Sequence, residues 1–332
     1  MNKIKNLEMF SPCSLRLCGI GIGKSMNRKI VSFYLVLLAV ILLNSNIVGE
    51  PRFEKLKQAL IEEGFREGLL DSIYSSGKVK FYPKLLEVNV FQKSYSDYYE
   101  RVPKPKNVEK GKLFYQEHKE LLKKCEQETK VPASIITALL YIETNFKEYK
   151  KNNLVVNVYF SLYFADEDSI IDKNIEKIRN SELSQAEKEK IISKAKRVAK
   201  RKSKWAFKEL KVLLKNFTAE ELLNLYGSWA GAIGYPQFIP SSYEIWAVDG
   251  NNDGKIDLFD FDDAIYSIAN YLNSNGWKEN LTDKQKKAVI HTYNHNWDYV
   301  TAVLKYAENL EKLLKNAGCD SVNTGAESIK EP

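Results

Sequence analysis

Glu143 is the residue that the sequence places best for acid–base chemistry. It stands near the end of an apolar run, 131–146, which opens with Pro132 and carries apolar side chains at helical spacing. On such a helix Glu143 continues the row of Ile136 and Leu140, so its carboxyl shares the apolar side. Apolar surroundings disfavour the charged form and raise the pKa, as a general acid requires. A glutamate at the rim of the apolar stripe, paired with a lysine or reaching solvent, fits the same helix and stays an open alternative.

A second candidate segment, 227–243, is rich in glycine and aromatic residues and reads GSWAGAIGYPQFIPSSY. Its glycines let the backbone approach a ligand closely. Ser228, Gln237 and the aromatic rings offer the hydrogen bonds and stacking faces that sugars require. Considered alone, the segment predicts a structured loop of unknown purpose.

Acidic and amide residues follow with the spacing of a calcium-binding loop. They fill ligand positions 1, 3, 5, 7, 9 and 12 of the EF-hand pattern, with the obligatory glycine at position 6. The residues are Asp249, Asn251, Asp253, Lys255, Asp257 and Asp260. Asp replaces the usual Glu at position 12, so the last ligand is one methylene shorter. We predict a structural Ca²⁺, or another cation in its place, and the alternative is an Asp-Gly turn without metal.

The last candidate segment, 293–300, reads YNHNWDYV. Tyr293 and Asn294 suit recognition of N-acetyl and hydroxyl groups if they face a cleft. A helix cap with core aromatic residues explains the same pattern equally well. His291 and His295 stand four apart without the glutamate of the H-E-x-x-H motif, which argues against a zinc site.

In this order the segments resemble the lytic murein transglycosylase B family. The similarity rests on VPASIITALLYIETNF, on YGSWAGAIGYPQFIPSSYEIWAVDGNNDGKIDLFDFDDAIYSIANYLNSNGW and on YNHNWDYV. It implies a mostly α fold, with a lysozyme-like α core and a small loop-rich subdomain that carries the EF-hand-like loop. It implies an enzyme that cleaves the β-1,4 bond between N-acetylmuramic acid and N-acetylglucosamine in peptidoglycan and forms 1,6-anhydromuramic acid ends.

The resemblance also assigns roles to individual residues. The catalytic glutamate of the family falls on Glu143, and its metal-binding loop falls on residues 249–260. The residues that line the family's site match Ser228, Gln237, Tyr271, Tyr293 and Asn294, with Tyr98 as a further match from the N-terminal part. One carboxyl would then serve twice, first as acid and then as base. No organic cofactor is implied.

The chain departs from the family pattern in places. Charged residues follow Phe146 where the family has glycines, Pro236 stands where glycine is common, and the charged segment 166–204 is an apparent insertion. These changes leave the peptide-stem contacts and the preferred strand length open. A hydrolytic muramidase and a non-catalytic wall-binding protein remain the alternative functions.

Length and composition agree with a globular protein. The excess of 50 Lys and Arg over 43 Asp and Glu favours an anionic partner. No recognition-helix, zinc-finger or RNP-like pattern accompanies it, so we do not expect nucleic-acid binding. We predict a leader at 1–49 with an apolar core at 30–43, which acts as a signal peptide or a membrane anchor. The protein is therefore expected in the periplasm or cell envelope, with membrane attachment through the leader as one possibility.

The remaining chain is predicted to be mostly helical. Residues 50–315 form the transglycosylase domain, with a charged helical hairpin at 166–204, and residues 316–332 form a polar tail. Capping-box patterns predict helix starts at Ser184, Thr218 and Thr282. Strand-like alternation is limited to short stretches at 79–82 and 86–91. Cys125 and Cys319 either pair or stay free, and the sequence does not decide between the two.

Overall fold

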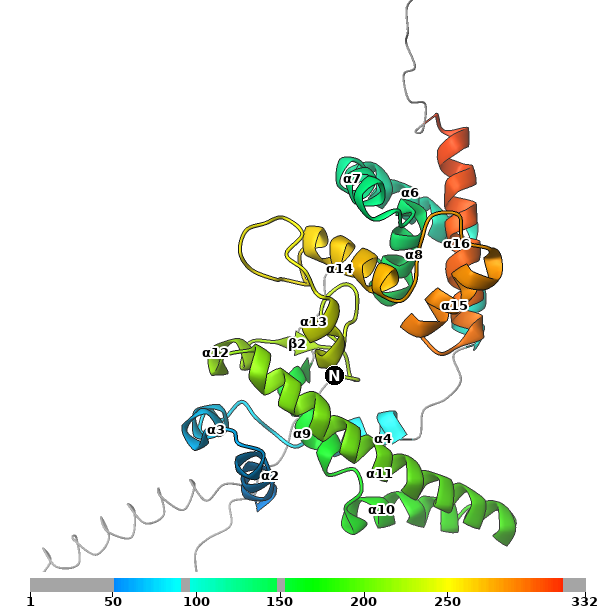
Figure 1. Cartoon of the computed structure of the whole chain (residues 1–332). Coiled ribbons are helices and arrows are strands. Elements are labelled where there is room, and N and C mark those ends of the chain that lie inside the picture. The colour runs from blue at the N-terminus through cyan, green and yellow to red at the C-terminus, as the bar shows by residue number, and fades with distance from the viewer. Residues whose placement is uncertain (1–50, 91–95, 148–152, 319–332) are drawn as a thin grey trace, which may run out of the picture. The chain divides into compact units, whose positions relative to one another are not determined.

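The computed structural model describes residues 51–90, 96–147 and 153–318 (Figure 1). Contacts divide the chain into two units, Met1–Pro51 and Arg52–Pro332. The predicted leader, residue 91 of the predicted strand and the tail beyond Gly318 lie outside the described residues. Among the described residues no helix is long and apolar enough to cross a membrane.

Helices make up most of the described chain, as predicted. They are α2 Pro51–Glu62, α3 Glu67–Tyr74, α4 Pro83–Val90, α5 Ser96–Arg101, α6 Pro105–Glu117, α7 Lys119–Thr129, α8 Ala133–Thr144, α9 Val155–Tyr163, α10 Asp168–Arg179, α11 Gln185–Asn216, α12 Ala219–Leu222, α13 Pro240–Trp246, α14 Phe261–Ser274, α15 Asp283–Tyr293 and α16 Trp297–Asn316. Two short strands, β1 Asn153–Leu154 and β2 Tyr226–Gly227, pair antiparallel.

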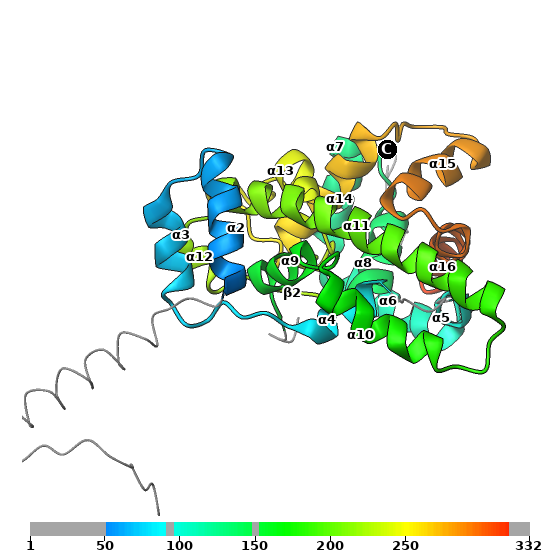
Figure 2. The same cartoon turned by 90° about the horizontal axis from the view of Figure 1, so that it is seen from below.

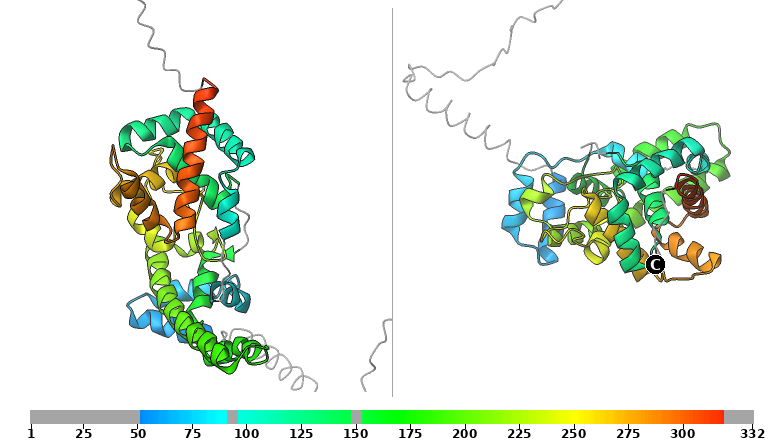
Figure 3. Two further views of the ribbon diagram at one scale, coloured as in Figure 1. Left: turned by 90° about the vertical axis from the view of Figure 1, so that its right-hand side faces the viewer. Right: turned by 90° about the horizontal axis from the view of Figure 1, so that it is seen from above.

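Helix α8 is the centre of one group of helices. Every residue from Ala133 to Ile142 is buried, because α6, α7, α14 and α16 pack around it (Figures 1 and 3). A helix that is apolar on all sides is stable only inside such a bundle. The buried hydroxyls of Thr137 and Ser134 are satisfied, since Thr137 donates to the Ala133 carbonyl and Ser134 donates to Glu311. The bundle therefore fixes where the last turn of α8, and with it Glu143, lies.

Helix α9 is the centre of a second group, where it packs against α11 and α4. The stretch 79–82 was predicted as a strand, but it forms no strand pairing with any residue that the structure describes. Its backbone is held by polar side chains of α9, because the Lys80 N–H donates to Asn157 Oδ1 and the Tyr82 N–H donates to Ser161 Oγ. The strand predicted at 86–91 is wrong for its described residues, which belong to α4. Packing of Leu85 and Leu86 into the core decides for helix there.

The charged segment 166–204 folds into α10 and the first part of α11, which lie side by side (Figures 1 and 2). A capping box at Ser184 and Glu187 starts α11, and those at Thr218 and Thr282 start α12 and α15, all as predicted. The basic residues of the hairpin lie mostly on the exposed side of α11. Cys125 is a buried free thiol whose pKa burial raises to about 12, while Cys319 lies outside the described residues.

Candidate active site

Glu143 is the penultimate residue of α8, half-buried at the point where the buried helix reaches the surface. Burial raises the pKa of its carboxyl from 4.5 to about 7, and a hydrogen bond from Tyr299 acts in the opposite direction. Burial wins, so the side chain carries a proton for a large part of the time at neutral pH. Among the described residues no second carboxylate contributes to this pKa.

Tyr299 holds the carboxyl from the first turn of α16. Its hydroxyl donates a hydrogen bond of 2.7 Å to Glu143 Oε1, and its side chain is 1% exposed. Asn296 caps the helix here by accepting from the N–H groups of Asp298 and Tyr299. No spacing in the sequence singles out Tyr299, although it stands in the segment YNHNWDYV, where a second phenol hydroxyl besides that of Tyr293 was the available signal.

Two further phenols lie close to the carboxyl. The charge of Glu143 contributes to a raised pKa at Tyr293, Tyr98 and Tyr299, although burial is the main cause at each of them. Tyr98 is 40% exposed, has a pKa raised to about 12, and donates 2.9 Å to the carbonyl of Ile142. Its exposed ring leaves it open to a ligand beside Glu143.

Tyr293 connects the carboxyl to the glycine-rich segment. Its hydroxyl donates 2.6 Å to the carbonyl of Pro236, next to Gln237. The centroid of its ring lies 4.8 Å from that of the Tyr271 ring. The Tyr271 hydroxyl in turn donates to the Thr292 carbonyl. The structure thus brings together Glu143, Tyr98, Tyr293 and Tyr271 from four helices.

Ser228 and Gln237 hold their own segment in shape. Ser228 Oγ accepts from the N–H groups of Ala230 and Ala232, at 3.2 and 3.0 Å. Gln237 has a left-handed φ of 53° and donates 2.7 Å from Nε2 to the Gly234 carbonyl. No hydrogen bond between described residues joins either side chain to Glu143.

Gly231 shows why the segment needs glycine. Its φ is 82°, and an added Cβ would lie 2.6 Å from the ring of Tyr159. The Tyr159 hydroxyl donates 3.0 Å to the Gly231 carbonyl, which ties the segment to α9. The backbone at this point is therefore held between a buried helix and the candidate site.

Asn294 ends α15 with an extended backbone, φ −144° and ψ 118°. Its side chain is half-buried and forms no hydrogen bond to another described residue. Because it directly follows Tyr293, it lies at the same end of α15 as the candidate site.

The turn after Glu143 is built by an aromatic stack. Asn145 and Phe146 both have a left-handed φ, 56° and 55°. Such a backbone costs about 1–2 kcal/mol for a residue like Phe. The ring of Phe146 stacks on Phe114 at 4.2 Å, and Lys110 donates to Asn145 Oδ1. These contacts hold the turn where the family pattern has glycines.

The predicted metal loop turns its acidic side chains onto its own backbone. Asp249 accepts from the N–H groups of Asp253 and Gly254, and Asp253 accepts from Lys255. The described residues contain no group of three or more His, Cys, Asp or Glu side chains arranged to hold a metal ion. Asp260, the predicted twelfth ligand, instead caps α14 by accepting from the Asp262 N–H.

Asp263, which the EF-hand spacing does not include, is the acidic residue that joins the two halves of this loop. Its carboxylate is 1% exposed and accepts from the N–H groups of Gly250, at 2.7 Å, and Asp257, at 2.6 Å. The loop also supports the glycine-rich segment, because the Tyr235 N–H donates 2.8 Å to the Leu258 carbonyl. The loop and the candidate active site therefore share one backbone framework.

The mostly helical fold, in which a half-buried glutamate stands in the last turn of a central helix, is shared with lysozyme-like transglycosylases of known structure. A family model described as a transglycosylase SLT domain matches residues 49–287, and the protein belongs to this family. The membrane-bound lytic murein transglycosylase B of Escherichia coli (strain K12) is 31% identical over 173 residues, which are 52% of this chain and 39% of that protein. The match thus spans about two fifths of the relative's length.

Solved structures share the fold. The Escherichia coli lytic transglycosylase SLT35 in complex with calcium aligns with a TM-score of 0.60 and 21% identity over 81% of this chain and 95% of that one. SltB3 from Pseudomonas aeruginosa in complex with NAG-NAM-pentapeptide aligns with a TM-score of 0.58 and 19% identity over 78% of each chain.

Proposed function

We propose that the protein is a peptidoglycan lytic transglycosylase with Glu143 as its single acid and base. The observation that carries this proposal is a carboxyl whose pKa burial raises to about 7, with no second carboxylate among the described residues acting on it. A typical hydrolytic glycosidase needs two carboxyl groups at a defined separation. One carboxyl suits a reaction in which the sugar supplies its own nucleophile, so transglycosylation is favoured over the muramidase alternative.

In the first step, protonated Glu143 donates its proton to the oxygen of the β-1,4 bond between N-acetylmuramic acid and N-acetylglucosamine, and that bond breaks. In the second step, the Glu143 carboxylate accepts the proton of the C6 hydroxyl. The C6 oxygen then bonds to C1 and closes the 1,6-anhydro ring. Glu143 thus ends the reaction protonated, as it began. A pKa near the working pH allows it to act as acid in the first step and as base in the second.

Tyr299 keeps the carboxyl in place during both steps through its hydrogen bond. Substrate contacts are proposed for residues on two sides of Glu143. They are Ser228, Gln237, Asn294, Tyr293, Tyr271 and Tyr98. The exposed ring of Tyr98 and the half-buried amide of Asn294 support direct contact with sugar hydroxyl and acetamido groups. Tyr293, Tyr271, Ser228 and Gln237 are held by bonds within the protein, which supports a role in shaping the cleft.

The loop at 249–260 is proposed to hold a structural cation, and Ca²⁺ is the preferred choice. Its donors are hard oxygens, from Asp249, Asn251, Asp253, Asp257 and the Lys255 carbonyl, and such oxygens are what calcium prefers. Asp263 faces the loop from α14, whereas Asp260 serves as a helix cap. A bound cation would neutralise the acidic loop and stiffen it. The SLT35 structure named above contains calcium, which supports this choice.

Peptidoglycan as the partner places the protein in the periplasm or cell envelope, and this rests on the enzymatic proposal. The relative in Escherichia coli is named membrane-bound. Attachment through the predicted leader is compatible with that name. The residues concerned, 1–49, lie outside those that the structure describes.

Digestion of purified sacculi tests the proposal. Wild-type protein should release muropeptides with 1,6-anhydromuramic acid ends, seen by mass spectrometry as products without added water. Glu143→Gln should reduce this release at least 10³-fold, since the acid is lost while the Tyr299 hydrogen bond persists. Glu117→Gln, an exposed glutamate of α6, is the matched control and should keep full activity. Reducing ends would indicate a muramidase, and sacculus binding without products would indicate a wall-binding protein.

A further inference from the structure

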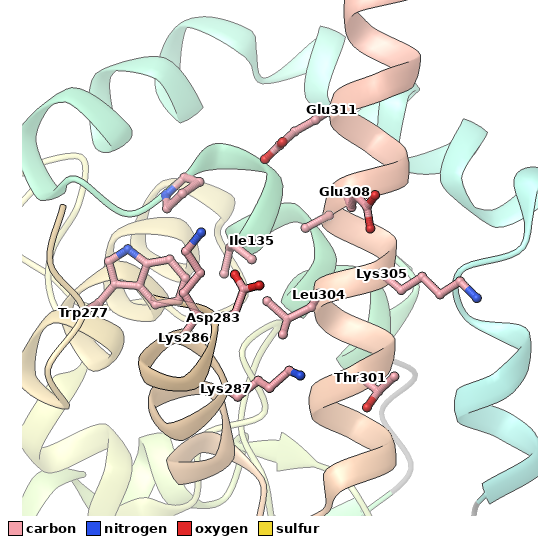
Figure 4. Close-up of a pocket in the computed structure, with 12 residues that line it drawn as sticks. Ile135, Trp277, Asp283, Lys286, Lys287, Thr301, Leu304, Lys305, Glu308 and Glu311 are labelled. Atoms are coloured by element: carbon pink, nitrogen blue, oxygen red, sulfur yellow. The ribbon is translucent and has the colours of Figure 1, made fainter. Parts of the chain in front are cut away.

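A charged crevice of about 600 Å³ lies away from the catalytic residues, between the first turn of α8, α15 and α16 (Figure 4). Its apolar lining residues are Pro132, Ile135, Trp277, Leu304 and Ala307, and its polar lining residues are Asp283, Lys286, Lys287, Thr301, Lys305, Glu308 and Glu311. This size lies within the range of protein sites for small ligands. None of the lining residues belongs to the candidate active site.

The crevice and the active site use opposite ends of the same helices. Ile135 precedes Glu143 by eight residues of α8, which is about 12 Å of helix. On α15 the crevice is lined by Lys286 and Lys287 in the first half of the helix, whereas Tyr293 of the active site lies in its last turn. A ligand in the crevice therefore does not occupy the catalytic cleft.

Opposite charges face each other across the crevice. Lys286 and Lys287 extend from α15, and Figure 4 shows the Lys287 ammonium reaching toward α16. Glu308 and Glu311 stand on α16, with the carboxyl of Glu311 turned to the crevice. No ion pair among the described residues crosses the gap.

The charged side chains on the two sides of the crevice are not paired with one another. Glu308 pairs with Lys312 along its own helix, and Glu311 accepts a 2.7 Å hydrogen bond from Ser134. Neither lysine has a salt bridge to a described residue. The two lysines of α15, with Asp283 on the same helix, therefore face the glutamates of α16 across a floor on which Trp277 lies almost fully buried, held by its indole N–H donating to the Lys130 carbonyl.

We infer that this crevice is a second, non-catalytic binding site for the amphoteric stem peptide of peptidoglycan. Such a peptide carries carboxylates that match Lys286 and Lys287 and an amino group that matches Glu311. Its methyl groups fit the apolar floor at Ile135 and Leu304. The choice of peptide rests on the proposed function, and it is favoured over a simple anion because the crevice carries both signs of charge.

A stem peptide bound in the crevice gives the enzyme a second point of contact with peptidoglycan. Once one stem peptide is bound, the glycan that bears it, or a neighbouring crosslinked strand, is kept near Glu143 at a raised effective concentration. The crevice then increases productive binding to intact sacculi. It contributes nothing to the cleavage of glycan strands stripped of peptide.

Titration calorimetry with a free peptide tests the inference without any sugar. The probe is L-Ala-γ-D-Glu-meso-diaminopimelate-D-Ala, added to full-length Glu143→Gln protein, which cannot process glycan. We expect saturable binding that weakens with salt. Lys286→Ala with Lys287→Ala should weaken it at least tenfold. Glu311→Gln, which keeps an acceptor for Ser134, should weaken it severalfold.

Lys284→Ala is the matched control, because Lys284 is an exposed lysine of the same helix α15 that does not line the crevice. Its binding should equal that of the parent protein. Absence of peptide binding, or equal binding by the double-lysine variant, overturns the inference. A second measurement compares substrates with Glu143 intact: the double-lysine variant should lose activity on sacculi and keep it on peptide-free strands. Failure of the catalytic proposal would remove activity on both substrates and leave the calorimetry unaffected.

Discussion

Tyr299 and Glu143 join the first turn of α16 to the last turn of α8 through a hydrogen bond of 2.7 Å. The bond has two effects that oppose each other. It orients the carboxyl, and because a phenol donates to it, it lowers the pKa that burial raises. The net value of about 7 shows that burial is the stronger effect, so the carboxyl remains an acid at neutral pH while its position stays defined.

Tyr299→Phe should shift the pH dependence of cleavage. Removal of the donor takes away a hydrogen bond to a charged group, worth about 1.5–3 kcal/mol, and therefore raises the Glu143 pKa by about 1–2 units. The alkaline limb of kcat/KM, expected near pH 7 in the wild type, should move upward by that amount while the rate at the optimum falls. Tyr306→Phe on the same helix loses a bond to the Asn107 carbonyl and serves as the control with an unshifted limb. If the alkaline limb of the kcat/KM profile of Tyr299→Phe is unchanged, the Tyr299 hydroxyl does not influence the pKa of the catalytic acid.

Glu143→Gln should stabilise the fold in a pH-dependent way. Folding raises the pKa of Glu143 from 4.5 to about 7, so the folded state binds the proton more tightly than the unfolded state does. Stability is therefore lost as pH rises between these two values, and the full cost, about 3 kcal/mol at most, is present above pH 7. The variant should be more stable than wild type at pH 8 and equal to it at pH 4, measured by urea unfolding. A pH-independent difference would contradict the raised pKa.

Calcium should raise the melting temperature of the wild-type protein, by an amount that grows with the logarithm of its concentration above Kd. Asp253→Ala should abolish this response, because it removes a proposed oxygen ligand from the exposed loop. Without calcium its melting temperature should match the wild type within about 2 °C, since Asp253 bonds only within the loop. Asp298→Ala, an exposed aspartate of α16, is the control that keeps the response. A wild-type melting temperature unaffected by both calcium and chelator would exclude a structural metal here.

Gly231→Ala should destabilise the protein by about 2–4 kcal/mol. The new Cβ meets the ring of Tyr159 in a position that a buried side chain cannot leave, and the left-handed φ adds its own cost. Gly64→Ala has a similar φ of 90° but open space around it, so it should lose only about 1 kcal/mol. The difference between the two variants in denaturant unfolding isolates the clash. Equal losses would mean that Tyr159 does not restrain the glycine-rich segment.

Local patterns predicted much of the helical framework because their causes are local. The capping boxes at Ser184, Thr218 and Thr282 depend on a side chain and a backbone three residues apart, and each one forms. The strand predicted at 86–91 failed for the converse reason. Its alternating pattern is compatible with a helix once Leu85 and Leu86 have a core to enter, and that core comes from distant segments.

The sequence by itself determined that Glu143 ends an apolar helix, and a resemblance in several segments marked the residues around it. The tertiary structure alone decided that Tyr299, 156 positions further along, donates to that carboxyl. It alone also decided that Asp263, and not Asp260, joins the ends of the acidic loop. A helix face follows from spacing along one segment, whereas a contact between two segments depends on how every intervening helix packs, and spacing does not encode that.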